Sequence, residues 1–259
     1  MKKLIVVALG IVSLSANAQI IDTVRRDSAK INALPDTVRH LESKAISFIP
    51  PAVFVTYGAL SFVIKPIRDV DIHVYNDLIE DHPNFHYHPE NYLQYAPVVM
   101  VYGLNLAGIH GKNTFIDRTV LLGMSEGIMA LSTFSLKKVT HRLRPDGSNR
   151  YSFPSGHSGN AFAAAEFMAQ EYGDKSPWYG VAGYTFATAT AILRVYNRDH
   201  WFSDIIAGAG FGILSTKAAY LIYPLFRNKL FHDKNSGKTT SLMPSFGNGM
   251  VGFAFTKQL

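Results

Sequence analysis

Six apolar segments of helical length limit what this chain can fold into more than any other feature of its sequence. Each carries at most one charged side chain, and mostly short polar links separate them. Segments of this length and composition predict helices that are buried on several faces, in lipid or against one another. They cover residues 45–64, 92–111, 119–136, 158–170, 177–193 and 205–226. The sequence therefore predicts an all-α fold, a six-helix bundle.

The first eighteen residues have the pattern of a secretory signal peptide. Lys2 and Lys3 precede an apolar run that ends near Leu14, and the small residues Ala16 and Ala18 follow it. The run is short for a transmembrane span, so cleavage before residue 19 is favoured over an uncleaved anchor. A polar arm, 19–44, is then expected to lead into a helical domain, 45–231.

Residues 232–259 are expected to form a polar C-terminal tail. Within it, apolar Val251, Phe253 and Phe255 alternate with small residues, which predicts either a single β-strand or a disordered end. One strand cannot close a barrel, so the tail does not change the all-α prediction.

Composition argues against several functional classes. The formal net charge of +6 includes Lys2 and Lys3, and no basic helix or aromatic-basic motif accompanies it, so a nucleic-acid partner is not expected. The chain has no cysteine, which excludes disulfides and thiolate ligands. Four residues of the polar connector 65–91 have side chains that ligate metals: Asp81, His82, His86 and His88. Pro83 and Pro89 interrupt any helix that would align them, so the connector is predicted to be a solvated loop without metal or cofactor.

Three short polar signatures lie among the apolar segments and contain the candidate reactive side chains. They cover residues 137–145, 154–157 and 194–204. Their candidate residues are Lys137 and Arg144 in the first, Ser155, Gly156 and His157 in the second, and Arg194, His200 and Asp204 in the third.

These residue types suit the binding of a phosphoryl group. Such a group carries negative charge on its equatorial oxygens during transfer, so its site needs fixed positive donors. Lys137, Arg144 and Arg194 can supply charge-assisted contacts. Ser155 and the backbone N–H groups near Gly156 add neutral donors, because a helix is predicted to begin there. The set is predicted to bind phosphate without a metal ion.

Three further side chains are candidates for the chemistry. His200 and Asp204 are four residues apart, so on a helix they share a face, and the carboxylate can orient the imidazole. His200 is then the nucleophile, while His157 protonates the leaving oxygen and later activates water. Each residue alone is more often a packed or surface side chain. The three signatures in this order favour a site over separate structural roles.

The signatures resemble those of the type 2 phosphatidic acid phosphatase superfamily, which includes lipid phosphatases, bacterial non-specific acid phosphatases and vanadium haloperoxidases. The likeness rests on Lys137 with Arg144-Pro145 after six residues, on residues 154–157, and on Arg194 spaced from His200 and Asp204 by five and three residues. It extends from about residue 92 to residue 226.

The resemblance implies a role for each matched residue. Lys137, Arg144 and Arg194 would bind phosphate with help from Ser155 and Gly156. His157 would be the general acid, His200 the nucleophile and Asp204 its orienting partner. One departure is Leu193, where the family often has serine, which puts a secondary phosphate contact in doubt.

The uncharged stretches 92–109 and 177–193 favour a membrane enzyme, since they exceed what a soluble helix needs on one face. The expected function is therefore a metal-independent phosphatase of the cell envelope acting on a phosphorylated lipid, such as lipid A, an isoprenoid carrier diphosphate or a phosphatidyl lipid. A soluble periplasmic acid phosphatase is the alternative, and a haloperoxidase or a non-catalytic lipid-phosphate binder fits less well.

The side of the membrane on which the signatures lie stays open at this point. With a cleaved signal peptide the chain starts outside, and a full crossing by residues 45–64 would place the signatures inside. A segment that dips in without crossing at Pro50-Pro51 would place them in the periplasm, facing outward from the bacterial inner membrane. The periplasmic orientation is the expected one, because membrane enzymes of the resembling family usually act on the outer side.

Overall fold

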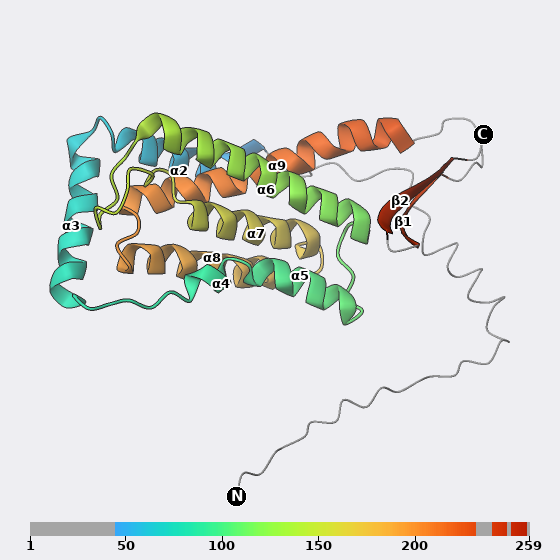
Figure 1. The fold of residues 1–259 in the computed structure, drawn as a ribbon, viewed down its shortest axis with the longest axis horizontal. Helices are drawn as coiled ribbons and strands as arrows, with labels where there is room; N and C mark the ends of the chain where they lie inside the picture. Colours follow the sequence, from blue (N-terminus) through green and yellow to red (C-terminus); the bar gives the residue numbers. More distant parts are fainter. Residues whose placement is uncertain (1–44, 232–239, 248–249, 258–259) are drawn as a thin grey trace, which may run out of the picture. The chain divides into compact units, whose positions relative to one another are not determined.

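The computed structural model describes residues 45–231, 240–247 and 250–257 (Figure 1). The expected signal peptide, 1–18, and polar arm, 19–44, lie outside the described residues. The described helices belong to one compact unit and the two strands to another. Within the described residues, the helices are η2 (Ala45–Phe48, a 3-10 helix), α2 (Ile49–Leu60), α3 (Lys65–Asp81), α4 (Glu90–Leu93), α5 (Ala96–Leu106), α6 (Phe115–Thr140), α7 (Gly156–Tyr172), α8 (Pro177–Tyr196) and α9 (Phe202–Phe231).

Each of the six predicted segments contains an α-helix, but the predicted number of helices is too low. The additional helices are α3 and the short α4, so the interpretation of 65–91 as a solvated loop is wrong over most of its length. Polar side chains on α3 concealed an amphipathic helix. Its Val74 and Leu78 pack against a buried cluster that includes Ile205.

Local sequence explains where several helices begin. Pro50 and Pro51 lie in the first turn of α2, where their missing N–H groups cost no intrahelical hydrogen bond, so they start a helix rather than divide one. Thr114 caps α6 by accepting from the Asp117 backbone N–H, and Ser176 caps α8 in the same way.

Helix α7 is the centre of the helical unit (Figure 1). Helices α5, α6, α8 and α9 all pack against it. Small side chains allow this close approach: Ala161 and Ala165 are fully buried, and a methyl group added to Gly212 of α9 would lie 2.8 Å from the backbone nitrogen of Ala163. The close packing of α7 against α9 therefore depends on small residues at these positions.

Two described helices are long and apolar enough to cross a membrane, Phe115–Thr140 and Phe202–Leu225. The pair Ala45–Leu60 and Lys65–Asp81 would add a third span if it were one, but it is bent by 88°. The uncharged stretches 92–109 and 177–193 favoured a membrane enzyme in the sequence analysis. They fold mainly into α5 and α8, and neither helix is among those long and apolar enough to cross a membrane. Helix α5 has only 11 residues, which is too short for a full crossing.

Residues 240–247 and 250–257 form an antiparallel hairpin, where the sequence predicted a single strand or a disordered end. Strand β1 (Thr240–Gly247) pairs with β2 (Met250–Lys257), with Gly247 opposite Met250 and Thr240 opposite Lys257. Of the two alternatives that the sequence left open for 250–256, the strand is the one that the structure contains, and its partner was missed. Pro244 lies inside β1, a residue that ordinarily argues against a strand.

Candidate active site

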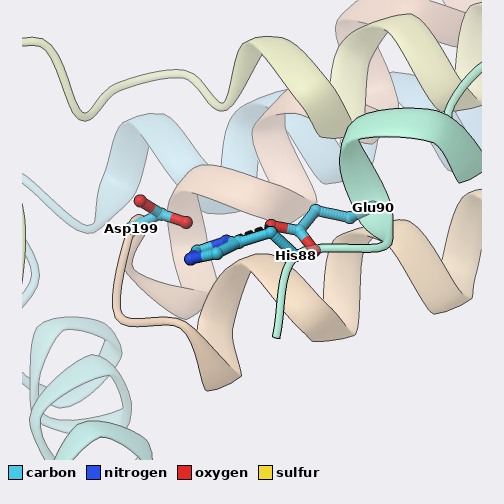
Figure 2. Close-up of side chains that lie close together, drawn as sticks. All are labelled: His88, Glu90 and Asp199. Atoms are coloured by element: carbon cyan, nitrogen blue, oxygen red, sulfur yellow. Dashed lines mark hydrogen bonds and ion pairs between the residues drawn. The ribbon is translucent and has the colours of Figure 1, made fainter. Parts of the chain in front are cut away.

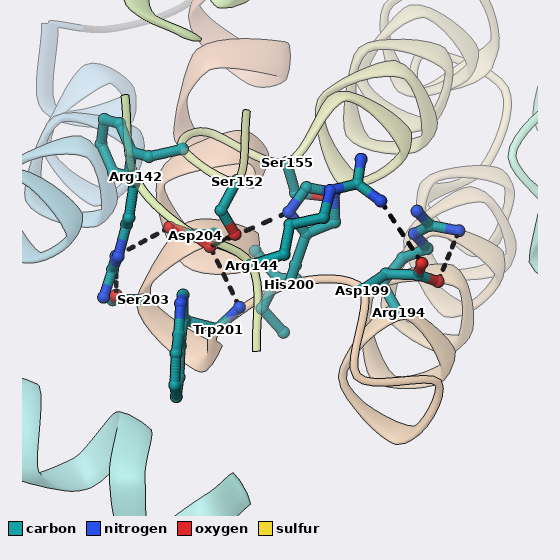
Figure 3. Close-up of polar contacts among 12 residues, drawn as sticks. Arg142, Arg144, Ser152, Ser155, Arg194, Asp199, His200, Trp201, Ser203 and Asp204 are labelled. Carbon is teal, nitrogen blue, oxygen red and sulfur yellow. Dashed lines mark hydrogen bonds and ion pairs between the residues drawn. The ribbon is translucent and has the colours of Figure 1, made fainter. Parts of the chain in front are cut away.

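The three polar signatures meet at one end of the helical unit, where α6 and α8 end and α7 and α9 begin (Figure 3). The Ser155 backbone N–H donates to the Asp204 carbonyl at 3.0 Å, which ties the start of α7 to the start of α9. The Asp146 backbone N–H donates to the Arg198 carbonyl at 3.2 Å, which joins the two connecting loops. The expectation that the signatures converge is therefore met in the fold.

The two predicted arginines of the phosphate site lie on either side of one carboxylate. Arg144 follows α6 and Arg194 is in the last turn of α8, and their Nη1 atoms lie 3.5 Å and 2.9 Å from the two oxygens of Asp199. Within the described residues, the Nε atoms of both arginines are buried and have no hydrogen-bond partner. Buried donors of this kind are normally satisfied, so the two Nε groups are available to a further acceptor.

Lys137 is in the last turn of α6 and reaches the loop that leads to α7. Its ammonium donates to the Tyr151 carbonyl at 2.6 Å. The charge of Lys137 acts on both His157 and His200, and the charge of Arg194 acts on the same two imidazoles. Lysine, arginine and both histidines therefore surround one region.

Helix α7 begins at Gly156 with Ser155 as its N-cap, so the predicted helix start at residues 155–157 is present. Ser155 is fully buried and its Oγ accepts from the Ser158 backbone N–H at 3.3 Å, so its own hydroxyl proton is available to a further acceptor. Nothing lies within 4 Å of where a methyl group on Gly156 would be, which leaves space at the helix start. His157 is anchored through Nε2, which lies 3.0 Å from the Asn91 side-chain oxygen.

His200 and Asp204 are neighbours, but not on one helix as predicted. His200 lies in the turn before α9 and Asp204 is in its first turn. His200 Nδ1 is 3.8 Å from the nearest oxygen of Asp204, longer than a hydrogen bond, and both side chains are almost fully buried. The contact still turns the Nδ1 edge of the imidazole towards the carboxylate, with Nε2 on the opposite edge of the ring.

Asp204 is fixed by three donors that the sequence did not single out. Arg142 Nη1 donates to it at 2.7 Å, the Trp201 backbone N–H donates at 3.0 Å, and Ser152 Oγ donates to the same oxygen as Trp201 (Figure 3). The bond to Trp201 is the reciprocal half of a capping box, with the third residue of the helix reaching back to the residue before it.

Arg142 continues this network to α3. Its Nη2 donates to Asp71 at 2.6 Å, and Asp71 also accepts from the backbone N–H and hydroxyl of Ser203, both at 2.7 Å. Asp71 was missed because its segment was interpreted as a connector. Arg142 lies inside the first signature, two residues before Arg144, and its position there was the only signal in the sequence.

Both histidines are predominantly neutral at pH 7 in the ligand-free protein. Burial lowers the pKa of His200 to about 4, against the opposing effect of Asp204. Burial also lowers the pKa of His157 to about 4, with Arg194 acting in the same direction and Glu90 opposing. A neutral His200 is suited to nucleophilic attack. His157 needs a proton before it can act as an acid, and a bound phosphate would offset the nearby cations and raise its pKa.

A histidine NMR titration should show these two residues protonating well below pH 6.5, with the His157 transition moving upward when inorganic phosphate is added. Assignment would come from His157→Asn and His200→Asn. Because the unfolded chain binds these protons at higher pH than the folded chain, the free energy of unfolding should fall as the pH is lowered from about 6.5 towards about 4. Protonation near pH 6.5, unaffected by phosphate, would contradict the described environment.

His88, Glu90 and Asp199 form the group with metal-ligating geometry among the described residues (Figure 2). One ligand atom from each lies within 4.8 Å of the others. Both carboxylates, however, are already paired with Arg194, at 3.2 Å from Glu90 and 2.9 Å from Asp199. A metal ion would compete with this guanidinium, so the pairing assigns the two acids to the arginine. Of the four residues weighed in the sequence, only His88 takes part.

Residues 118–228 match the model of the PAP2 superfamily. The matched region contains all three signatures, in agreement with the resemblance in the sequence.

A lipid A 1-phosphatase from Porphyromonas gingivalis is 36% identical over 175 residues, which are 64% of this chain and 39% of that protein. The chain therefore spans about two fifths of the length of this relative.

Two solved structures are also similar. One is LpxE from Aquifex aeolicus, with 18% identity, a TM-score of 0.42, and coverage of 56% of this chain and 92% of that one. The other is a transmembrane PAP2 type phosphatidylglycerolphosphate phosphatase from Bacillus subtilis, with 19% identity, a TM-score of 0.49, and coverage of 73% and 98%.

Proposed function

We propose that this chain is a membrane phosphatase that removes phosphate from a lipid through a phosphohistidine intermediate, without a metal ion. The observation that carries the proposal is the pair of buried, unpartnered Nε donors on Arg144 and Arg194 beside a neutral imidazole. Donors of that kind are suited to an oxyanion, and the adjacent His200 is suited to attack it.

In the proposed first step, the phosphate lies between the arginines, Lys137 and the start of α7. The Nε2 lone pair of His200 forms the N–P bond as the P–O bond to the lipid breaks. Protonated His157 gives its proton to the leaving oxygen. Asp204 keeps the Nδ1 edge of His200 turned towards itself, and its negative charge stabilises the imidazole as positive charge develops.

The second step uses the same residues in reverse. Neutral His157 accepts a proton from water as the water oxygen bonds to phosphorus, and the N–P bond breaks. Inorganic phosphate leaves, and His200 and His157 return to their starting protonation states once the product has dissociated. The balance of the two steps is one lipid phosphate and one water converted to one lipid alcohol and one inorganic phosphate.

The proposed substrate class is a lipid phosphate or diphosphate, with lipid A the first candidate because of the Porphyromonas gingivalis relative. An isoprenoid carrier diphosphate and a phosphatidyl lipid are the other candidates. Helices α6 and α9 are long and apolar enough to span a membrane, which favours a lipid substrate over the soluble acid phosphatase that is the second candidate.

The direct test is phosphate release by the purified protein in detergent with chelator present, on lipid A, an isoprenoid carrier diphosphate, a phosphatidyl phosphate and p-nitrophenyl phosphate. The proposal expects release from at least one lipid, at a rate that the chelator does not change. Release from the soluble ester alone, by protein that stays in the aqueous phase without detergent, would replace it with the second candidate.

We also propose that the site faces the periplasm from the bacterial inner membrane. Because the chain contains no cysteine, single introduced cysteines can report this directly. Ser148 is exposed in the loop at the site end, and Lys175 is exposed in the link between α7 and α8 at the other end. A membrane-impermeant maleimide on intact spheroplasts should label Ser148→Cys and spare Lys175→Cys. The reverse pattern would place the site in the cytoplasm.

A further inference from the structure

Asp199 stands between the two arginines of the site and contacts both (Figure 3). Its Oδ1 lies 3.5 Å from Arg144 Nη1 and its Oδ2 lies 2.9 Å from Arg194 Nη1, and its side chain is only 15% exposed. The two arginines come from different parts of the chain, one after α6 and one at the end of α8. One carboxylate therefore sets the spacing between two cations that no other described contact joins directly.

Asp199 contacts particular nitrogen atoms of the two guanidinium groups, and this choice decides which N–H groups stay available. A guanidinium offers several N–H groups, and the ion pairs with Asp199 use Nη1 of each arginine. Both Nε donors stay buried and unpartnered within the described residues. Asp199 thus contacts Nη1 of each arginine and not Nε. Both Nε groups are therefore free to donate to an incoming oxyanion.

Glu90 supports Arg194 from a second direction. It is fully buried, and its Oε1 accepts from Arg194 Nη1 at 3.2 Å and from the Asn197 side-chain amide at 3.1 Å. The same oxygen lies 2.9 Å from His88 Nδ1. Arg194 is therefore confined by two acids, and Asp199 is the one that also reaches Arg144.

We propose that Asp199 is a positioning residue that joins Arg144 and Arg194 into one phosphate clamp, holding their Nη1 atoms so that both Nε groups meet the same phosphate. The inference rests on the proposed function for the identity of the ligand. It adds a residue that lies within the third signature but is not among its candidate residues. It also explains how two long side chains keep a fixed separation before substrate arrives. Preorganised donors bind more tightly because less side-chain freedom is lost on binding.

A rival explanation would make Asp199 an internal substitute for phosphate, which the substrate must displace. A substitute would be expected to satisfy the donors that the phosphate uses, whereas the Nε donors are left without a partner. The two explanations also predict opposite results when the carboxylate is removed. Loss of a positioning residue weakens phosphate binding, and loss of a substitute strengthens it.

The test is binding of inorganic phosphate and orthovanadate to the full chain in detergent, by calorimetry and by inhibition of p-nitrophenyl phosphate hydrolysis. Asp199→Ala should weaken both ligands by about 10- to 100-fold, the range expected for losing oriented charged hydrogen bonds. Asp199→Asn keeps one acceptor oxygen, so its loss should be smaller. KM should rise more than kcat falls in both variants.

Asp77→Asn is the matched control, because Asp77 is an exposed residue of α3 that carries the same charge. It should leave phosphate binding unchanged, which separates positioning from net charge. Tighter phosphate binding by Asp199→Asn, or unchanged binding by a folded Asp199→Ala, would overturn the clamp alone. A folded wild-type protein that binds neither phosphate nor vanadate would overturn the proposed function and the clamp together.

Discussion

Replacing His200 by alanine should abolish phosphate release, with a loss of about a thousandfold or more in kcat. The expectation follows from its place beside Asp204 and from its low pKa of about 4, which keeps the ring neutral and nucleophilic at pH 7. The measurement is phosphate release under saturating substrate. His200→Asn, which retains a planar polar side chain, should be equally inactive.

His73→Ala is the matched control, because His73 lies exposed on α3 and is not part of the site. It should keep wild-type activity. Thermal unfolding in detergent must accompany the measurement, since His200 is buried and its truncation also leaves a cavity. A folded His200→Ala protein with wild-type turnover would eliminate the phosphohistidine mechanism.

His157→Ala should also be inactive towards lipid phosphates, but for a different reason. Attack by His200 does not itself require His157 when the leaving group needs no proton, as with p-nitrophenyl phosphate. This variant should therefore accumulate phosphoenzyme in a single turnover, because water is no longer activated against the N–P bond. The double variant with His200→Ala should not, and accumulation there would assign the nucleophile to another residue.

The helices of the bundle were predictable because each one coincides with an apolar segment, and local residues mark where several of them begin. Proline in the first turn and serine or threonine caps start several of them, and the small residues of α7 allow its central position. Helix α3 was not predictable in the same way. Its charged residues dominate its composition, and only its packing against Ile205 shows which face is buried.

The hairpin had a local sequence signal that the prediction did not use. Residues Asn248 and Gly249 separate the two strands, and Asn-Gly between alternating runs is a strong hairpin signature. The sequence prediction used only the alternation over 250–256, so strand β1 before that turn was missed. An antiparallel pair places Pro244 opposite Phe253 without interrupting the register.

The candidate site contains two kinds of residue: those proposed to bind phosphate or to react, and those that position them. Phosphate binding, proton transfer and nucleophilic attack each require particular side-chain types. Lys137, His157 and His200 were therefore singled out from the sequence. Arg142, Asp71 and Asp199 act through other residues. Arg142 and Asp71 are far apart in the chain, and Asp199 contacts Arg144 of a different signature. Spacing alone does not identify such residues, because the fold decides which charges meet.

Arg142→Ala should be among the most destabilising single substitutions at this end of the helical unit. Its guanidinium bridges Asp71 and Asp204, which are 1% and 0% exposed, at 2.6 Å and 2.7 Å. Removing it leaves two buried carboxylates without their cation, which typically costs about 3–5 kcal/mol. Phosphate release should fall as well, because Asp204 loses a donor that fixes its position. Thermal unfolding in detergent and the phosphate assay measure the two effects.

Arg150→Ala is the control for Arg142, since Arg150 is exposed in the same loop. Arg142→Lys should recover only part of the stability, because one ammonium cannot span both acids as a planar guanidinium does. Adding Asp71→Asn to Arg142→Met should restore stability more than activity, since it removes a buried charge without returning the donor to Asp204. Equal unfolding temperatures for Arg142→Ala and Arg150→Ala would show that the bridge contributes nothing, and that α3 is held over the site by Ser203 and apolar packing instead.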